Sequence, residues 1–374
     1  MKYIICGIAP GFGGVGKLME YLSDKLDDSK YVMLYPKTFS FKNRYLRWII
    51  NQISKQIFFN LKLRGIKNKD IILMHHQSIG LKVTKLLIDH NKSIDFYVMD
   101  NAFFCLKSYN YIEGQNKECL ECVGGNFESA FKNNCKVFPY KHSANNNVKF
   151  LRYLKTQYKK IKFYALSVSN ASLLKKHFGE DIFVKVIYFL TKDILRDQQN
   201  AKSLQYNNNG YDVVFHGADL EAKGFIYIQE LAKELKQYSF FIPTKKKLKH
   251  KKENIFTKYI EWETGLKEVV INANLVLTPS LWSNTPEAAT LKSFLYNGSV
   301  GLIKNKYGFA NDIDHKAYLQ LSGDKNVDVK IIDNFLKEKK YISLRKNGKA
   351  YIKKYFESAN KSMQIFFSFE CNQD

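Results

Sequence analysis

The feature of this sequence that most constrains its fold is a repeated alternation of short strand-like runs with helix-like runs. The first run, Lys2–Ala9, is almost wholly apolar, as expected of a strand covered on both faces. In the next run, Leu18, Leu22 and Leu26 recur at helical spacing. The alternation continues with strands at Tyr31–Tyr35, Asp70–His75, Asp95–Met99, Lys162–Val168 and Val184–Phe189, and helices at Arg44–Leu63, Ile79–His90 and Ala171–Phe178. This rhythm predicts an α/β fold with a parallel sheet and helices on both faces.

The alternation breaks once, at the polar stretch Gln198–Gly210, and then begins again. Three consecutive asparagines make this stretch the best candidate for a linker between domains. After it, strands are expected at Asp212–Phe215, Ser239–Ile242, Leu275–Thr278 and Val300–Ile303, and helices at Tyr227–Tyr238, Leu266–Ala273 and Pro286–Tyr296. A chain of 374 residues is long enough for two such domains, and a ligand cleft commonly lies between them.

The sequence therefore predicts four parts. The first doubly wound domain covers 1–197 and carries a cysteine-containing insertion at about 101–145. A linker, 198–210, leads to a second doubly wound domain at 211–342. The last segment, 343–374, is expected to form a helix that packs back on the first domain.

Charge is the most unusual feature of the composition. Lysine and arginine number 59 against 35 acidic residues, which gives a net charge of +24. Such a charge suits a polyanionic partner, either nucleic acid, an anionic membrane or a phosphorylated substrate, or reflects only a lysine-rich composition. No apolar run approaches the roughly 18 residues that span a bilayer, and Met1–Ala9 reads as a first strand and not as a secretion signal. We therefore expect a cytoplasmic protein.

A glycine-rich loop follows the first strand. Glycines at this position let the backbone approach a phosphate at a helix N-terminus. Gly11, Gly13 and Gly16 fit a dinucleotide-binding fingerprint, but no acidic residue follows the second strand at the required distance. The loop also fits a Walker A motif ending at Lys17, except that Leu18 replaces the hydroxyl residue that holds magnesium. Asp100 could then act as the second acidic motif of such an NTPase.

The second half of the chain favours a third interpretation of this loop. Phe215-His216-Gly217 is followed by Lys223-Gly224-Phe225 and a helix, and Ala273–Ser280 is followed by Leu281-Trp282 and by Glu287 at the start of another helix. This order resembles the donor-binding half of family 4 GT-B glycosyltransferases, in which the lysine meets the donor diphosphate. Gly13-Gly14 before a helix is likewise similar to the family's first loop.

Three further segments extend the resemblance over nearly the whole chain. Leu166–Gly179 looks like the family's strand and helix before the interdomain crossing. His75-His76 follows a strand, as histidines of the family often do. Lys349–Phe356 is similar to the C-terminal helix that crosses back between the domains.

The resemblance implies a GT-B fold, with two Rossmann-like domains facing a central cleft, and a hexosyltransferase activity. The implied substrates are a nucleotide sugar and a glycan or lipid-linked acceptor, as in cell-surface polysaccharide or lipopolysaccharide biosynthesis, with no cofactor required for catalysis. The residues it implies are Lys223 and Asp100 for catalysis, Lys223, Gly217, Ser280, Glu287 and Gly14 for the donor, and Gly13 and His76 for the acceptor.

Three positions depart from the family pattern. Ala218 stands where the family has an arginine, Leu295 where it has a second glutamate, and Met99 where it has a histidine before the aspartate. Without that imidazole a retaining mechanism is favoured, in which the leaving phosphate helps to deprotonate the acceptor. A catalytically degenerate, glycan-binding relative is the alternative.

Four of the six cysteines are clustered in the predicted insertion. Cys105, Cys119, Cys122 and Cys135 have the paired spacing that lets thiolates share one tetrahedral ion, and the segment between them is poor in apolar residues. We expect a structural zinc at these four residues, the alternative being four unligated thiols. A zinc-stabilised nucleic-acid-binding protein is a rival class, but the restarted α/β pattern argues against it, so no nucleic acid partner is expected.

The helix expected at Arg44–Leu63 alternates aromatic and aliphatic with basic residues, Trp48 and Arg47 among them. Such a helix suits the surface of an anionic membrane, and would place the protein at the inner face of the membrane. The alternative is an ordinary domain helix with one buried face.

Overall fold

The computed structural model describes residues 1–11, 13–138, 143–201, 210–248 and 252–368. The chain divides into two compact units. The first comprises Met1–Tyr109, Leu120–Lys192 and the chain from Met363 on, and the second comprises Asn110–Cys119 and Asp193–Ser362.

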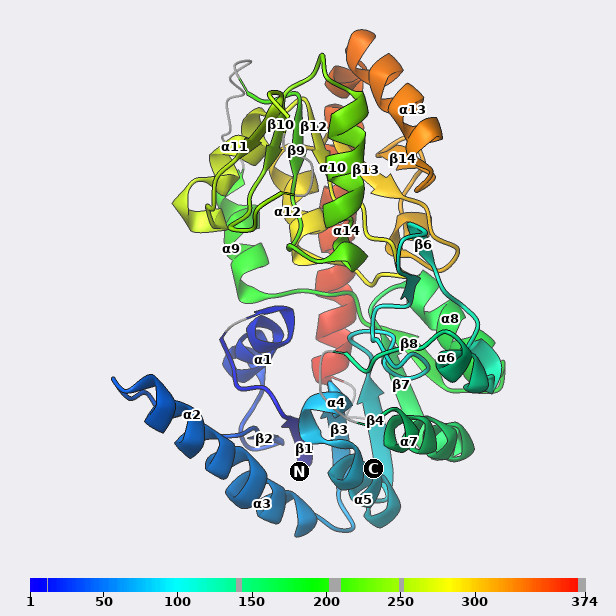
Figure 1. Cartoon of the computed structure of the whole chain (residues 1–374). Coiled ribbons are helices and arrows are strands. Elements are labelled where there is room, and N and C mark those ends of the chain that lie inside the picture. The colour runs from blue at the N-terminus through cyan, green and yellow to red at the C-terminus, as the bar shows by residue number, and fades with distance from the viewer. Residues whose placement is uncertain (12, 139–142, 202–209, 249–251, 369–374) are drawn as a thin grey trace. The chain divides into compact units, whose positions relative to one another are not determined.

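The first unit is built on a six-stranded parallel sheet (Figure 1). Its strands are β1 (Lys2–Cys6), β2 (Tyr31–Leu34), β3 (Asp70–Met74), β4 (Ser93–Tyr97), β7 (Ile161–Ala165) and β8 (Val184–Val186). They lie in the order β2-β1-β3-β4-β7-β8, with Ile4 of β1 opposite Met33 of β2 and Ile72 of β3. The central strands are apolar because helices cover both faces of the sheet.

The helices of this unit are held by the apolar stripes that the sequence predicts. In α1 (Gly13–Lys25), Leu18, Met19 and Leu22 are buried. The others are α2 (Arg44–Ile53), continued by the π-helix η1 (Ser54–Phe59) and by α3 (Asn60–Arg64), then α4 (His76–Ile79), α5 (Leu81–His90), α6 (Glu128–Lys132), α7 (Ala144–Gln157) and α8 (Val168–Phe178). Ser143 and Ser167 cap α7 and α8 by accepting a backbone N–H in the first turn.

The second unit has its own six-stranded parallel sheet. Its strands are β9 (Val213–Phe215), β10 (Phe240–Ile242), β11 (Ile255–Thr257), β12 (Leu275–Leu277), β13 (Val300–Ile303) and β14 (Leu319–Leu321), and its helices include α10 (Phe225–Glu234), α11 (Leu266–Asn272), α12 (Ala288–Tyr296) and α13 (Lys325–Lys337). Successive residues pack on opposite faces: Val213 and Phe215 join one apolar cluster, and Val214 joins the other.

Each sheet reverses its strand order at one point. In the first unit the reversal lies between β1 and β3, and in the second, ordered β11-β10-β9-β12-β13-β14, it lies between β9 and β12. The loops that leave the carboxyl ends of two such strands run in opposite directions and open a crevice, which is where ligands of doubly wound sheets bind. The topology therefore marks one candidate site in each unit.

The unit boundaries differ from the predicted ones. The second unit begins at Asp193, ahead of the linker predicted at 198–210, because α9 (Lys192–Asn200) is tied to α12: Lys292 pairs with Asp193 at 2.9 Å and with Asp197 at 2.8 Å. Residues 202–209, most of that linker, lie outside the described residues.

The predicted insertion and the last helix are also divided between the units. Within 101–145, the antiparallel hairpin of β5 (Tyr111–Ile112) and β6 (Lys117–Glu118) belongs to the second unit. The helix α14 (Tyr341–Ser368) belongs to the second unit up to Ser362 and to the first from Met363. There Phe366 packs edge-on against Tyr97 and Tyr164. Among the described residues, no helix is long and apolar enough to cross a membrane.

Candidate functional site

The candidate site of the second unit lies where the loops after β9 and β12 diverge. The loop after β9 leads through the 3-10 turn η5 (Glu221–Lys223) to Gly224, which precedes α10. Gly224 has a φ of +81°, and a Cβ there would lie 2.5 Å from the carbonyl oxygen of Pro279 in the loop after β12. Glycine is required because the two loops touch backbone to backbone, and this contact holds Lys223 beside the second loop.

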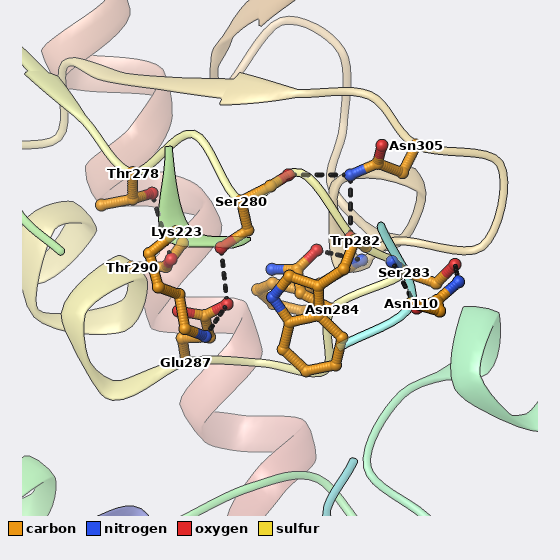
Figure 2. A network of polar contacts seen from close by, with 11 residues as sticks. Asn110, Lys223, Thr278, Ser280, Trp282, Ser283, Asn284, Glu287, Thr290 and Asn305 are labelled. Carbon is orange, nitrogen blue, oxygen red and sulfur yellow. Dashed lines mark hydrogen bonds and ion pairs between the residues drawn. The ribbon is translucent and has the colours of Figure 1, made fainter. Parts of the chain in front are cut away.

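Lys223, Glu287 and Ser280 form one polar cluster (Figure 2). The Lys223 Nζ lies 2.8 Å from the Glu287 Oε1, and the Ser280 hydroxyl donates to that same oxygen at 2.7 Å. The Lys223 ammonium also lies 4.7 Å from the centre of the Trp282 ring. The lysine is therefore held by a carboxylate and by an aromatic face, both of which stabilise its charge.

The loop after β12 has its own supports. The Asn305 side chain donates to the backbone oxygens of Ser280 and Trp282, both at 2.8 Å. Thr290 of α12 donates to Thr278 at 3.1 Å (Figure 2). Glu287 is the residue that precedes α12, so its carboxylate lies at a helix N-terminus. The cluster is thus fixed by hydrogen bonds on several sides.

His216 follows β9 and is buried behind the cluster. Its ring stacks on Trp262, with the ring planes 3° apart, and its Nδ1 lies 2.9 Å from the Ser293 Oγ. Because that hydroxyl donates to the Ala289 carbonyl, the histidine Nδ1 carries the hydrogen. Burial, together with nearby Lys292, lowers the pKa of His216 to about 3, so the ring is neutral. Gly217, the predicted donor contact, comes next; a Cβ there would meet the Phe215 ring at 2.6 Å.

In the first unit the glycine loop is open. Gly11 and Gly13 have φ values of +126° and +73°, which favour glycine, and nothing lies within 4 Å of a Cβ at either position. Gly14 is exposed, and the nearest atom to its Cβ position belongs to Phe189, at 4.0 Å. Leu18 is fully buried. An apolar core residue therefore stands where an NTPase would hold magnesium.

The structure separates the two adjacent histidines after β3. His76 is 4% exposed, stacks on Phe150 and packs at a tilt against Phe96, so its ring is part of the core. This placement does not suit the acceptor contact predicted for His76. His75, in a left-handed conformation with φ +51°, instead places its Nε2 3.6 Å from the Asp100 Oδ2.

In the first unit, Asp100 lies close to two polar groups, the Ala102 N–H and the His75 ring. Its carboxylate accepts the Ala102 N–H at 2.9 Å. Burial alone would raise the pKa of Asp100, but the contacts with His75 and the Ala102 N–H hold that pKa below its usual value. His75, which follows the neighbouring strand β3, thus places an imidazole beside Asp100. Because the two residues follow different strands, a search for adjacent histidine and aspartate could not find this pair.

The four cysteines of the predicted zinc site are assigned to both units. Cys105, Cys122 and Cys135 belong to the first unit, whereas Cys119 belongs to the second. In the described part of the chain, no three histidine, cysteine, aspartate or glutamate side chains are arranged as metal ligands. Structural zinc at these four cysteines stays a prediction from their spacing in the sequence.

Two doubly wound units, each with a candidate site at the carboxyl edge of its sheet, form the architecture of GT-B glycosyltransferases, and solved structures confirm this fold. Sucrose-phosphate synthase from Thermosynechococcus elongatus superposes with a TM-score of 0.61 over 100% of this chain and 99% of its own, at 13% identity. HepE from Anabaena, in complex with UDP-glucose, gives 0.58 over 98% and 100%, at 12% identity.

A third similar structure is WaaG, a glycosyltransferase involved in lipopolysaccharide biosynthesis, with a TM-score of 0.53 over 98% of this chain and 100% of its own, at 13% identity. No protein-family model matches the chain, and no curated protein matches it in sequence. At these identities the likeness establishes the fold, and the activity has to be argued from the site.

Proposed function

We propose that this chain is a glycosyltransferase that moves a sugar from a nucleotide-sugar donor to a glycan or lipid-linked acceptor. The observation that carries the proposal is the cluster of Lys223, Glu287 and Ser280 at the switch point of the second sheet. A lysine and the N-terminal ends of α10 and α12 suit a diphosphate, and a carboxylate suits sugar hydroxyls. The UDP-glucose in the HepE structure supports a nucleotide sugar as the ligand.

We further propose that the transfer is retaining. The bond between the sugar carbon and the phosphate oxygen breaks while the acceptor oxygen bonds to that carbon, and the acceptor proton passes to the leaving phosphate on the same face. Lys223 stabilises the charge that develops on this phosphate. Since Lys223 and the helix ends supply the positive charge there, this step requires no metal ion or other cofactor.

We assign the acceptor to the first unit. The exposed Gly13 leaves room for an acceptor to approach the carboxyl edge of the sheet. The Asp100 carboxylate, which lies beside His75, can accept a hydrogen bond from an acceptor hydroxyl. Polysaccharide or lipopolysaccharide synthesis at the cytoplasmic face of the cell envelope is the setting we propose.

The helix α2 supports a membrane location for this reaction. It has no buried residue, and Tyr45 and Trp48 on it are 69% and 59% exposed. Within α2 the structure therefore does not show the buried face expected of an ordinary domain helix. Buried residues follow only after α2, at Ser54, Phe59 and Leu63. Exposed aromatic residues among basic ones are typical of helices that lie in the surface of an anionic bilayer.

The experiment that tests the function is a thermal-shift screen with UDP-, GDP-, ADP- and CMP-sugars. A donor present at about 100 times its dissociation constant should add roughly 2.7 kcal/mol of apparent stability. Stabilisation by one nucleotide sugar, followed by transfer to an acceptor, would support the proposal. Binding without transfer would indicate a degenerate relative, and magnesium-dependent ATP hydrolysis without sugar-nucleotide binding would overturn it.

A further inference from the structure

The hairpin formed by residues 110–119 lies on the candidate donor site, although it comes from the first half of the chain. The chain leaves the first unit after Tyr109 and returns to it at Leu120. Between these points the hairpin contacts the loops that follow β9, β12, β13 and β14. All four loops lie at the carboxyl edge of the parallel sheet, the edge at which ligands bind.

Asn110 is the residue that fastens the hairpin to the loop after β12. Its side chain is buried; the Nδ2 donates to the Ser283 Oγ at 2.9 Å, and the Oδ1 accepts the Ser283 N–H at 3.1 Å (Figure 2). The same Nδ2 donates to the Cys119 carbonyl at 2.9 Å and so closes the base of the hairpin. One amide therefore fixes both the shape of the hairpin and its attachment.

Glu118, on the opposite strand, completes the attachment. Its carboxylate accepts the Ser283 hydroxyl and also the backbone N–H of Lys306 in the loop after β13. At the hairpin turn, the Gly114 N–H donates to the Glu221 Oε1 at 2.8 Å. Glu221 belongs to the same short turn as Lys223. The hairpin thus binds both loops that carry the cluster.

Trp282 connects this attachment to the lysine. It is the neighbour of Ser283, its backbone oxygen is held by Asn305, and its ring faces the Lys223 ammonium (Figure 2). A shift of Ser283 would therefore move the indole ring away from the lysine and disturb the loop that carries Ser280.

We propose that the hairpin is a positioning element of the donor site, and that Asn110 and Glu118 hold the Ser280–Trp282 loop in the shape that binds the diphosphate of a nucleotide sugar. This inference rests on the proposed function. Neither residue touches the donor; each acts through Ser283 and Trp282.

The test is calorimetric binding of UDP, GDP, ADP and CMP to the full-length chain and its variants. In Asn110→Ala and Glu118→Ala the dissociation constant of the nucleotide that binds the wild type should rise about tenfold, which corresponds to about 1.4 kcal/mol. Glu118→Gln, which keeps one acceptor oxygen, should recover part of this loss. Gln115→Ala, an exposed position of the same hairpin, is the matched control and should leave affinity unchanged.

A purely structural hairpin would lower the melting temperature without changing nucleotide affinity measured well below it. Dissociation constants within about twofold of wild type for Asn110→Ala and both Glu118 variants, alongside a weakened Lys223→Ala, would overturn this inference and leave the proposed function standing. If Asn110→Ala does not fold, the nucleotide affinities of Glu118→Ala and Glu118→Gln test the inference. Failure of the wild type to bind any of the four nucleotides would overturn both.

Discussion

Three features restrict the motion of the Lys223 side chain. It is only 13% exposed, it is paired with the Glu287 carboxylate, and it faces the Trp282 ring. A flexible ammonium would lose rotamer freedom on binding a phosphate, whereas this one is already placed. An incoming diphosphate would share Lys223 with Glu287, whose carboxylate keeps the hydrogen bond from Ser280.

We expect Lys223→Ala to lower the turnover number about a hundredfold, on the order of 3 kcal/mol, because a charge contact to the developing phosphate anion is lost. Steady-state kinetics with the donor found in the screen would measure it. Lys233→Ala, at an exposed position of α10, is the control and should keep wild-type turnover. Wild-type turnover in Lys223→Ala would remove this lysine from the mechanism.

Two buried histidines should make the protein sensitive to acid. Burial is the main cause that lowers the pKa of His216 to about 3, and burial near Lys155 does the same for His177. An unfolded chain has a histidine pKa of about 6.5, so between these values it binds more protons than the folded chain. Stability is fully present above about pH 6.5 and falls as the pH drops towards 3, by at most about 1.4 kcal/mol per pH unit for each histidine.

The variant His216→Phe keeps a ring against Trp262 but cannot titrate. Urea unfolding of wild type and variant at pH 7 and pH 5 should show a smaller loss of unfolding free energy in the variant. Equal losses in both proteins would show that His216 is protonated as readily in the folded chain as in the unfolded one.

At the scale of elements, the glycine loop separates the two nucleotide-binding hypotheses. Because the Cβ position of Gly14 meets nothing closer than 4.0 Å, Gly14→Val should fold normally while its side chain obstructs the loop. We expect Gly14→Val to lower transferase activity at least about tenfold and Lys17→Ala to change it little. The assay is transfer at saturating donor, with melting temperature as a check on folding. Loss of ATP hydrolysis in Lys17→Ala would favour the NTPase instead.

The helix α2 makes a second prediction at this scale. The chain should sediment with vesicles that contain phosphatidylglycerol but not with phosphatidylcholine alone, and added salt should weaken the binding, since basic side chains supply part of it. Removing the aromatic rings in Tyr45→Ala/Trp48→Ala should weaken partitioning roughly tenfold. Ile342→Ala, which removes an apolar side chain that is 63% exposed on α14, is the control.

If the wild type and Tyr45→Ala/Trp48→Ala bind the vesicles equally well, α2 is not the membrane contact. A shift of the chain to a dimer that Tyr45→Ala/Trp48→Ala abolishes would show instead that a second copy covers this helix.

The predicted zinc site concerns the whole molecule, because its four cysteines belong to two different units. Protein purified without chelator should contain about one zinc per chain, and Cys122→Ser should reduce this content, because each thiolate contributes to the affinity of a four-cysteine site. Metal analysis measures both. Cys6→Ser is the control, since Cys6 is buried in β1. A metal-free and fully active chain would show that these four cysteines bind no zinc.

The whole-molecule organisation was only partly readable from the sequence. The two α/β units followed from the restarted alternation, but their limits did not. The boundary at Lys192–Asp193 depends on the pairing of Asp193 and Asp197 with Lys292, and the place of the hairpin depends on Asn110 meeting Ser283. Such partners are distant in sequence, so the composition near the boundary does not predict them.

The sequence by itself determined the fold class, the positions of most strands, and a lysine-glycine pair ahead of a helix at a sheet edge, because apolar periodicity and glycine conformation are properties of neighbouring residues. Only the tertiary structure decided that Lys223 meets Glu287, that the His75 ring lies beside Asp100, and that a hairpin from the first half belongs to the second unit. These contacts depend on the direction in which each turn points a side chain. A residue in the left-handed conformation, such as His75, changes that direction from one position to the next.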